Sequence, residues 1–492
     1  MLRRGRLVKR MDRRVAEYTS SLEEDLRIFR QVIKVNIAHV VMLQSRGIIS
    51  RDEASRIVSP LLELLRVRPS RLRLSPDLED IHMVVEDYVL RRAGEVGGKI
   101  HIAKSRNDQV AAAIRLQAIE ELASVERELL GLVEALVEKA EETTEIVMPG
   151  YTHLQVGEPT TFGQYLLAYA QAFLRDCKRI AAARNGLDSC PMGSCALAGT
   201  SFDVDRRMVA KLLGFSRIDA NTMDAVSSRD WLLEAMAALS ITMTNISRLS
   251  EDMIIWSSLE FGFVDLPEEF CSTSSIMPQK KNPVVFETAR AKAAEVIGLL
   301  SGAFSIVKAL PQSYNLDLQE LTPLLWKSVD ETRQAVGVVR IIVSGLRVNP
   351  DRMMRSVEAG FATAVDLANW LVKSCGLGFR QAHAVVGRVV RNLIDEGRSL
   401  KDIRSDDIER AANEVLGSRV KIPDDVIAEV VDPLRAVSSR DVEGGPSPAR
   451  VRQQVKAVER EISRLSESNR EAVRRLSLAE ERLLRTARRM CG

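Results

Sequence analysis

The stretch that decides the fold is residues 109–144, QVAAAIRLQAIEELASVERELLGLVEALVEKAEETT. Its apolar residues recur at steps of three and four, at Val110, Ile114, Ala118, Leu122, Val125, Leu129, Leu132, Leu136 and Ala140. This spacing places them on one face of a very long helix. Such a helix can bury that face only against other long helices. The stretch therefore predicts an all-α fold centred on a long-helix bundle.

Further long helices are expected on both sides in sequence. Thr160 or Thr161 can cap one that runs toward Arg184, and residues 229–256 and 284–307 form two more. Because Pro and Gly punctuate the flanking regions, we expect shorter helices there. The predicted parts are an N-terminal helical domain (1–108), the central bundle (109–346), a C-terminal helical domain (347–446) and an amphipathic terminal helix (447–492).

The terminal helix follows a Gly- and Pro-rich break at residues 444–448. After the break an apolar stripe repeats at steps of four and three, at Val451, Val455, Val458, Ile462 and Leu465. The stripe can dock on the body of the same chain or pair with another subunit, and we favour docking.

Composition favours an ordinary soluble globular protein. The chain has 492 residues, 46% hydrophobic and 28% charged, with a net charge of +3. Basic and acidic residues are mixed, so we expect no nucleic-acid partner, and no apolar run is long enough to cross a membrane. The six cysteines form no C-x-x-C pair and have no zinc-ligand spacing. We therefore expect reduced thiols, no metal site and a cytoplasmic location.

The loop TSSIMPQKKNP, residues 273–283, concentrates hydroxyl, ammonium and carboxamide groups around two prolines. Such a loop is poorly suited to a core and well suited to binding a carboxylate. The nearby Cys271 is interpreted as a packing residue.

Two other segments carry polar groups beside expected helix starts. In MPGYTHLQ, residues 148–155, Pro149-Gly150 predicts a turn beside Thr152 and His153. The segment is either a capping turn or a site for proton transfer, since histidine carries protons near pH 7. In SRNDQ, residues 105–109, the helix start can receive an anion, or Ser105 or Asp108 can simply cap the helix. Both interpretations can hold together.

Together these segments resemble the argininosuccinate lyases of the fumarase/aspartase superfamily. The first resembles the superfamily signature G-S-S-x-M-P-x-K-x-N, with Thr273 in place of Gly. The second resembles M-P-G-Y-T-H-L-Q, and S-R-N-D-Q is typical of argininosuccinate lyases. The similarity also includes residues 79–86, 193–206 and 224–230, and it covers roughly residues 20–451.

The resemblance implies cleavage of argininosuccinate to arginine and fumarate by β-elimination, in arginine biosynthesis, without a cofactor. It implies that Ser274 is the catalytic base, that Lys280 and Asn282 hold the carboxylate, and that Glu287 orients His153 in proton transfer. The remaining substrate-binding positions that it implies are Ser105, Arg106, Asn107, Thr152, Tyr314 and Gln319. A weakly basic serine needs activation, for which an ammonium group and backbone N–H donors are suitable.

Two positions depart from the family on the arginine side of the substrate. Asn36 stands where a substrate-binding serine is expected, and Thr322 stands where a lysine is expected. The resemblance also implies a homotetramer with a twenty-helix core, in which three subunits contribute to each active site. Two alternatives stay open: another superfamily lyase that releases fumarate, and a non-catalytic structural protein on the same fold.

Overall fold

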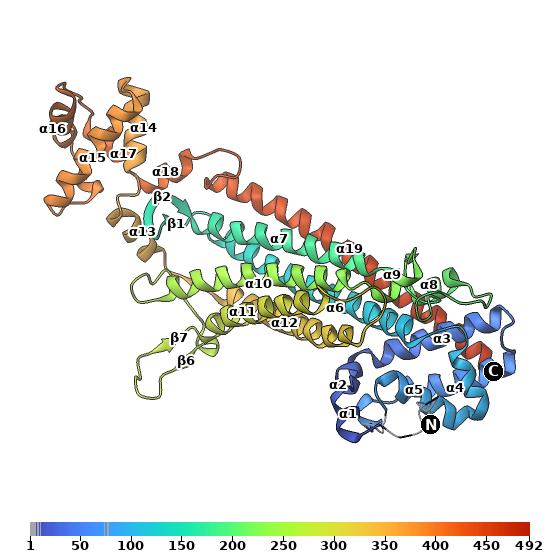
Figure 1. Ribbon diagram of the computed structural model, residues 1–492. Coiled ribbons are helices and arrows are strands. Elements are labelled where there is room, and N and C mark those ends of the chain that lie inside the picture. The colour runs from blue at the N-terminus through green and yellow to red at the C-terminus, as the bar shows by residue number, and fades with distance from the viewer. Residues whose placement is uncertain (1–5, 7–8, 10, 73, 76–77) are drawn as a thin grey trace.

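The computed structural model describes residues 6, 9, 11–72, 74, 75 and 78–492. Figure 1 shows an elongated, almost entirely helical molecule with a bundle of long helices at its centre. The bundle consists of α6 (Arg106–Glu142), α7 (Phe162–Leu187), α10 (Asp230–Ser257), α11 (Val284–Val307) and α12 (Leu321–Gly345). The predicted all-α, long-helix fold is confirmed, and the fold-deciding stretch lies almost entirely within α6.

Side-chain caps set where two of these helices begin. The Ser105 hydroxyl accepts the Asn107 N–H at 3.4 Å, and Asp108 accepts the Ser105 N–H at 3.1 Å, which makes a reciprocal cap on α6. Thr161 caps α7 by accepting the Gln164 N–H at 3.1 Å. Both caps agree with the sequence-based expectation.

Shorter helices cover the end of the bundle where α6 begins. Residues buried in these helices belong to the same continuous apolar core as the bundle, for example Ile33, Leu61 and Val85. The helices are α1 (Arg13–Tyr18), α2 (Leu22–Asp25), α3 (Phe29–Ser45), α4 (Arg51–Leu64) and α5 (Ile81–Ala93), followed by a 3-10 segment, Gly94–His101.

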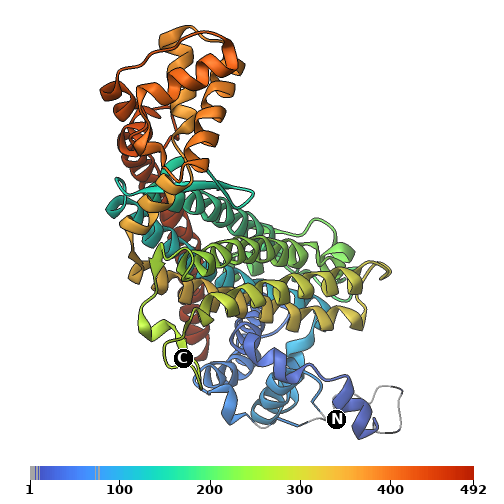
Figure 2. The same cartoon turned by 90° about the vertical axis from the view of Figure 1, so that its left-hand side faces the viewer.

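A second helical unit stands at the opposite end and has an apolar core of its own, which includes Leu367, Val385 and Ile408. Figure 2 shows most of this unit projecting beyond the bundle. Its helices are α13 (Pro350–Ala359), α14 (Ala364–Cys375), α15 (Phe379–Asp395), α16 (Ser405–Leu416), α17 (Asp424–Val430) and α18 (Pro433–Ser439).

The terminal helix α19 (Pro448–Cys491) runs back along the bundle to the N-terminal helices (Figure 1). The predicted stripe is buried in the main core, from Val451 at 0% exposure to Ile462 at 6%. Within the same contact, the Arg184 guanidinium donates to Glu126 and, at 2.6 Å, to the Asn469 side-chain oxygen. The docking interpretation of this helix is therefore confirmed.

The few strands in the described residues form two-stranded pieces that connect helices. The pairs are β1 (Val147–Thr152) with β2 (Gln155–Thr161), β3 (Ser189–Cys190) with β4 (Arg217–Ile218), β5 (Val264–Asp265) with β8 (Arg347–Val348), and β6 (Ser272–Thr273) with β7 (Lys281–Asn282). Helices α8 (Arg206–Leu213) and α9 (Thr222–Ser227) lie between α7 and α10 in the chain.

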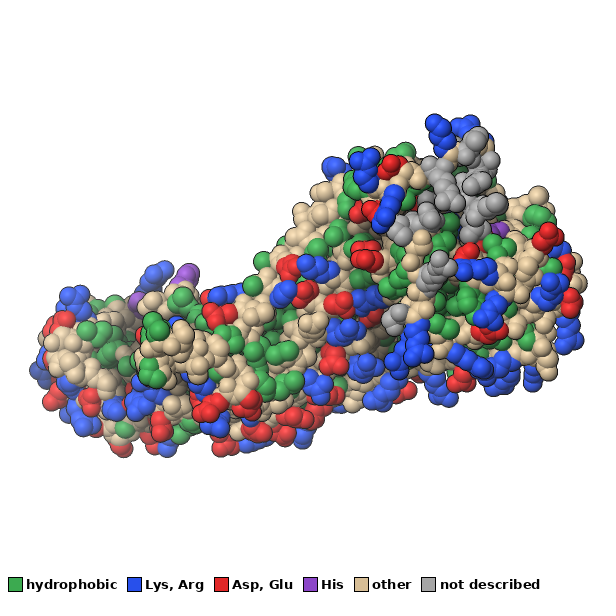
Figure 3. All heavy atoms as spheres, turned by 90° about the horizontal axis from the view of Figure 1, so that it is seen from below, with side chains coloured by type: hydrophobic (Ala, Val, Ile, Leu, Met, Phe, Trp, Pro, Cys, Tyr) green, Lys and Arg blue, Asp and Glu red, His purple; other side chains and the backbone are tan. Residues whose placement is uncertain are grey.

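The surface mixes both signs of charge. On the face in Figure 3, basic and acidic side chains are interspersed along the length of the molecule. No helix in the described part of the chain has the length and apolar character that crossing a membrane requires.

Candidate active site

The predicted site residues fall into three groups at two ends of the bundle. Ser105, Arg106 and Asn107 open α6, whereas Thr152 and His153 follow its far end. Helix α6 has 37 residues, so these two groups are separated by roughly 55 Å at about 1.5 Å per residue. The third group consists of Ser274, Lys280 and Asn282 on the connection from α10 to α11, and Glu287 at the start of α11. This connection also lies away from the N-terminal helices (Figure 1). One chain therefore does not bring the three groups together.

The first group borders a cavity of about 260 Å³ at the start of α6. Arg106, Asn107, Tyr314, Gln319 and Thr322 line it, although they come from two separate parts of the chain. The structure thus joins four of the predicted binding residues. Ser105 lies beside them as the helix cap and does not line the cavity itself.

Hydrogen bonds hold these side chains in place. The Arg106 guanidinium lies 2.8 Å from Asp80 and 3.5 Å from Glu86. Asn107 donates its amide to the Ala196 carbonyl at 3.0 Å, and Gln319 donates to the Thr19 carbonyl at 3.2 Å. Their positions are therefore fixed before any ligand enters.

Sequence reasoning missed several polar residues that line the same cavity, among them Ser21, Asp25 and Arg229. The Ser21 hydroxyl donates to Asp25 at 2.7 Å, and burial raises the pKa of the Asp25 carboxyl to about 7. The buried Arg229 guanidinium lies over the Trp231 ring at 5.6 Å, and burial lowers its pKa to about 10. In the sequence, Ser21 and Asp25 resemble an ordinary helix start. Arg229 lies in the matched segment 224–230, but nothing in that segment marks it as a cavity residue.

Asn36, where the family was expected to have a substrate-binding serine, does not line this cavity. It is 2% exposed, donates to the Val32 carbonyl at 2.9 Å and accepts a hydrogen bond from the buried Lys104 ammonium. Its polar groups are thus satisfied inside the protein. The departure at Asn36 therefore lies outside this cavity, at a position where buried polar groups pair with each other.

The second group sits on a tight hairpin rather than on a capping turn. Pro149 and Gly150 do not form the turn that the sequence indicated; they lie in strand β1, beside a register irregularity. The turn residues are His153 and Leu154, at φ values of 57° and 56°. Positive φ at both positions is the geometry of a two-residue hairpin turn, which usually selects Asn and Gly. His153 is therefore exposed at the tip on a strained backbone.

Aromatic packing fixes the base of this hairpin. The Tyr151 ring centroid lies 5.1 Å from that of Trp256 and 5.9 Å from that of Phe261, at the end of α10. A Cβ on Gly150 would lie 2.8 Å from the Glu158 carbonyl oxygen, so glycine is needed for the two strands to approach. The hairpin therefore presents its tip from a rigid base.

The third group lies on the loop between β6 and β7. The Ser274 hydroxyl accepts the backbone N–H groups of Ile276 at 3.3 Å and Met277 at 3.1 Å. These are donors of the kind expected to activate this serine. Lys281, by contrast, donates to Asp265 at 2.7 Å, while Lys280 is exposed and has no charged partner among the described residues.

Thr273, which departs from the signature glycine, pairs with Lys281 across the two strands. Its φ is not positive, so a Cβ brings no backbone strain there. Glu287 lies exposed in the first turn of α11. Within the described chain no hydrogen bond or ion pair connects Glu287 to His153, or Lys280 to Ser274.

The chain is similar to known lyases over most of its length. Residues 5–298 match the Lyase family, and residues 361–438 match the family described as Argininosuccinate lyase C-terminal. The argininosuccinate lyase of Methanothermobacter thermautotrophicus is 45% identical over 92% of this chain and 96% of its own length. That of Methanocaldococcus jannaschii is 39% identical over 98% and 99%.

Solved structures show the same fold. An EDDS lyase with bound formate has a TM-score of 0.87 at 29% identity and covers 94% of this chain and 92% of its own. The class II fumarase of Schistosoma mansoni has a TM-score of 0.70 at 18% identity, over 83% and 90%, and supports the fold alone. From its sequence matches over nearly its whole length, this chain belongs to the argininosuccinate lyase family.

Proposed function

We propose that the protein cleaves argininosuccinate to arginine and fumarate in arginine biosynthesis, at active sites that three subunits of a homotetramer build together. The observation that carries this is the separation of the candidate residues. The groups around Arg106, His153 and Ser274 each match a different segment of the family's site, yet no single chain joins them.

Exposed apolar side chains on the bundle support the assembly. Large apolar residues of α10, α11 and α12 are half exposed in the single chain: Ile241 at 42%, Ile297 at 46%, Phe304 at 50% and Ile341 at 54%. Helices this long with an uncovered apolar face bury it efficiently against copies of themselves. Antiparallel packing of such copies brings opposite bundle ends together.

The chemistry follows from the β6–β7 loop. In this proposal Ser274 removes the proton beside the carboxylate, since two backbone N–H groups stabilise its oxygen as an alkoxide. The negative charge that develops on the carboxylate is stabilised by Lys280 and Asn282. His153, oriented by Glu287, assists proton transfer to the departing nitrogen.

The cavity at the start of α6 supplies the part of the site that is already formed in one chain. Asn107, Tyr314 and Gln319 contact the substrate there, with Arg106 held in place by Asp80 and Thr152 contributed by a neighbouring subunit. Thr322 offers a hydroxyl where a lysine was expected, while the buried Arg229 keeps a cationic group on the same wall. We infer a cytoplasmic location, as suits a biosynthetic enzyme with reduced cysteines.

The two alternatives are another lyase activity and a non-catalytic structural role. A different lyase activity is suggested by the fold of EDDS lyase, but that chain is 29% identical, whereas the argininosuccinate lyase relatives reach 45%. A structural protein would not need Ser274, His153, Lys280 and Glu287 together.

An absorbance assay for fumarate tests the activity. The purified protein should release fumarate from argininosuccinate, and Ser274→Ala should lower kcat by about 10²–10⁴-fold, the usual contribution of a positioned proton-transfer group. Ser275→Ala, on the same loop, is the matched control. Activity with adenylosuccinate or aspartate, and none with argininosuccinate, would contradict the proposal.

Mixing two inactive variants tests the shared site. Ser274→Ala and Asn107→Ala tetramers that are dissociated and reassembled together should regain part of the activity, because some mixed sites then contain no altered residue. An active monomer in size-exclusion chromatography with light scattering would refute the shared site while leaving the reaction itself intact.

A further inference from the structure

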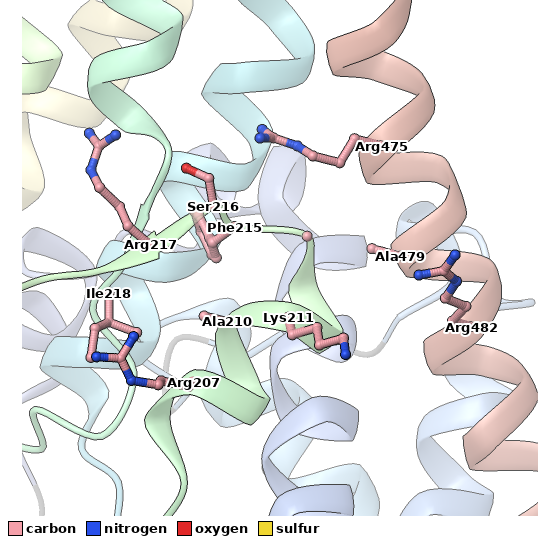
Figure 4. A pocket seen from close by; sticks show the side chains of 11 residues that line it. Arg207, Ala210, Lys211, Phe215, Ser216, Arg217, Ile218, Arg475, Ala479 and Arg482 are labelled. Atoms are coloured by element: carbon pink, nitrogen blue, oxygen red, sulfur yellow. The ribbon is translucent and has the colours of Figure 1, made fainter.

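A second cavity, lined by none of the residues matched to the reaction, lies where α19 packs on α8 and β4. It has a volume of about 330 Å³, near the lower end of small-molecule sites. Figure 4 shows side chains approaching it from two sides, with Arg475 and Arg482 on α19 and Arg207, Lys211 and Arg217 on α8 and β4.

The charge around this cavity is one-signed, unlike the mixed surface elsewhere. Five of its lining residues are basic, and none of the described lining residues is acidic. Asp188 accepts a hydrogen bond from Arg475 and neutralises that one cation. Arg207, Lys211 and Arg482 have no ion-pair partner in the described part of the chain, and Arg217 donates only to the carbonyls of residues 185 and 186.

The acidic residue of α19 that lies between two of these cations does not balance them, because it is paired elsewhere. Glu480, on α19 between Arg475 and Arg482, pairs with Arg30 and Lys34 of α3. Each exposed cation on its own would be an ordinary solvated side chain. Four unneutralised cations around one hollow repel each other, and a bound anion relieves that repulsion.

The base of the cavity is closely packed. Gly214, at φ 85°, ends α8, and a Cβ there would lie 3.0 Å from both Ala479 and Leu476 of α19. Phe215 is 5% exposed, and Gly214 and Ala479 are also buried. The basic side chains therefore surround a closely packed cavity base in which the Phe215 ring is covered. A covered ring offers no surface for a nucleobase to stack on, so the cavity suits a charged ligand group better.

We propose that this cavity binds an anion that carries two or more phosphate groups, such as a diphosphate or triphosphate. Guanidinium groups bind phosphate oxygens in pairs, and Lys211 adds a point charge. The ligand bridges α19 to α8 and β4, so its binding stabilises the docked terminal helix. A hollow enclosed on two sides favours such a compact ligand over a nucleic acid, which needs an extended basic face.

Isothermal titration calorimetry on the full-length protein tests this, with inorganic tripolyphosphate, ADP, orthophosphate and a short single-stranded RNA as probes. We expect tripolyphosphate to bind with a submillimolar Kd and orthophosphate to bind at least about tenfold more weakly. ADP that binds as tightly as tripolyphosphate, or more tightly, identifies a nucleotide as the source of the phosphates. Tripolyphosphate that binds more tightly identifies an inorganic polyphosphate.

Variants separate the cavity from general surface charge. Lys211→Gln and Arg482→Gln should each raise the Kd for tripolyphosphate by about tenfold, the effect of one charge-assisted hydrogen bond. Arg485→Gln, exposed on the same helix but outside the cavity, should change it by less than about threefold. Circular dichroism confirms that each variant is folded.

Absence of tripolyphosphate binding, equal weakening by Arg485→Gln, or binding of RNA alone would each overturn the proposal. None of these results depends on the reaction that the enzyme catalyses.

Discussion

Replacing Asn469 by leucine should loosen the terminal helix α19 from the bundle. Asn469 is buried where α19 crosses α6 and α7, and its side chain forms two hydrogen bonds. Its oxygen accepts from the Arg184 guanidinium at 2.6 Å, and its amide donates to the Ala123 carbonyl at 2.9 Å. Leucine has nearly the same size and removes both hydrogen bonds, while the Arg184 guanidinium and the Ala123 carbonyl stay buried.

The structure sets the expected magnitude. A hydrogen bond from a charged donor contributes about 1.5–3 kcal/mol and a neutral one about 0.5–1.5 kcal/mol. The apolar contacts of leucine offset roughly 1 kcal/mol of the loss. The Arg184 Nε is already without a partner among the described residues, so no spare bond compensates. We therefore expect α19 to be destabilised by about 1–3.5 kcal/mol.

Hydrogen exchange measured by mass spectrometry checks this locally. Where exchange follows the opening equilibrium, this loss corresponds to roughly 5- to 400-fold faster exchange of amides in residues 465–480. Ser468→Leu places the same side chain on the exposed neighbouring position and should change exchange by less than about threefold. Unchanged exchange in Asn469→Leu, or an equal change in both variants, would refute the reasoning.

Three further changes test other parts of the structure by thermal unfolding. Burial raises the pKa of Asp25 from 3.8 to about 7, so its contribution to stability is fully present below the unfolded pKa and is lost as pH rises to about 7. Asp25→Asn should therefore raise the Tm above pH 7 and not near pH 4, and the same substitution at the exposed Asp52 serves as the matched control. Gly163→Ala should cost about 1–3 kcal/mol, because its Cβ would lie 2.7 Å from a carbonyl oxygen of α6; Gly387→Ala, with open space around it, should instead be neutral or slightly stabilising. Leu154→Gly should stabilise the hairpin by about 0.5–1 kcal/mol, since Leu154 has positive φ and is 65% exposed; a lower Tm would contradict the strained turn.

The long helices could be predicted from the sequence because the apolar residues that recur along each helix are the same residues that pack in the core. The apolar steps from Val110 to Ala140 and from Val451 to Leu465 each correspond to one buried face. The expected start of the helix at Val284 is the start of α11. Such segments are long, so errors at their ends matter little.

The candidate site was harder to predict because proximity in space leaves no local signal. Ser21, Asp25 and Arg229 share a cavity with Tyr314 only because α2, α10 and α12 meet at the start of α6. The turn at His153 and Leu154 was missed for another reason. Neither residue favours positive φ, so Pro149-Gly150 was the stronger turn signal in the sequence.

The same geometry supports the proposal that the site is completed by assembly. A 37-residue helix separates the cavity at Arg106 from the hairpin that presents His153, and bending the chain to join them would break the bundle core. Moving these residues together within one chain would therefore cost more than bringing two chains side by side. The half-exposed apolar residues of α10, α11 and α12 provide a surface for that contact. In the assembly proposed above, the bundle that separates the candidate catalytic groups in one chain would also be the surface through which other subunits bring them together.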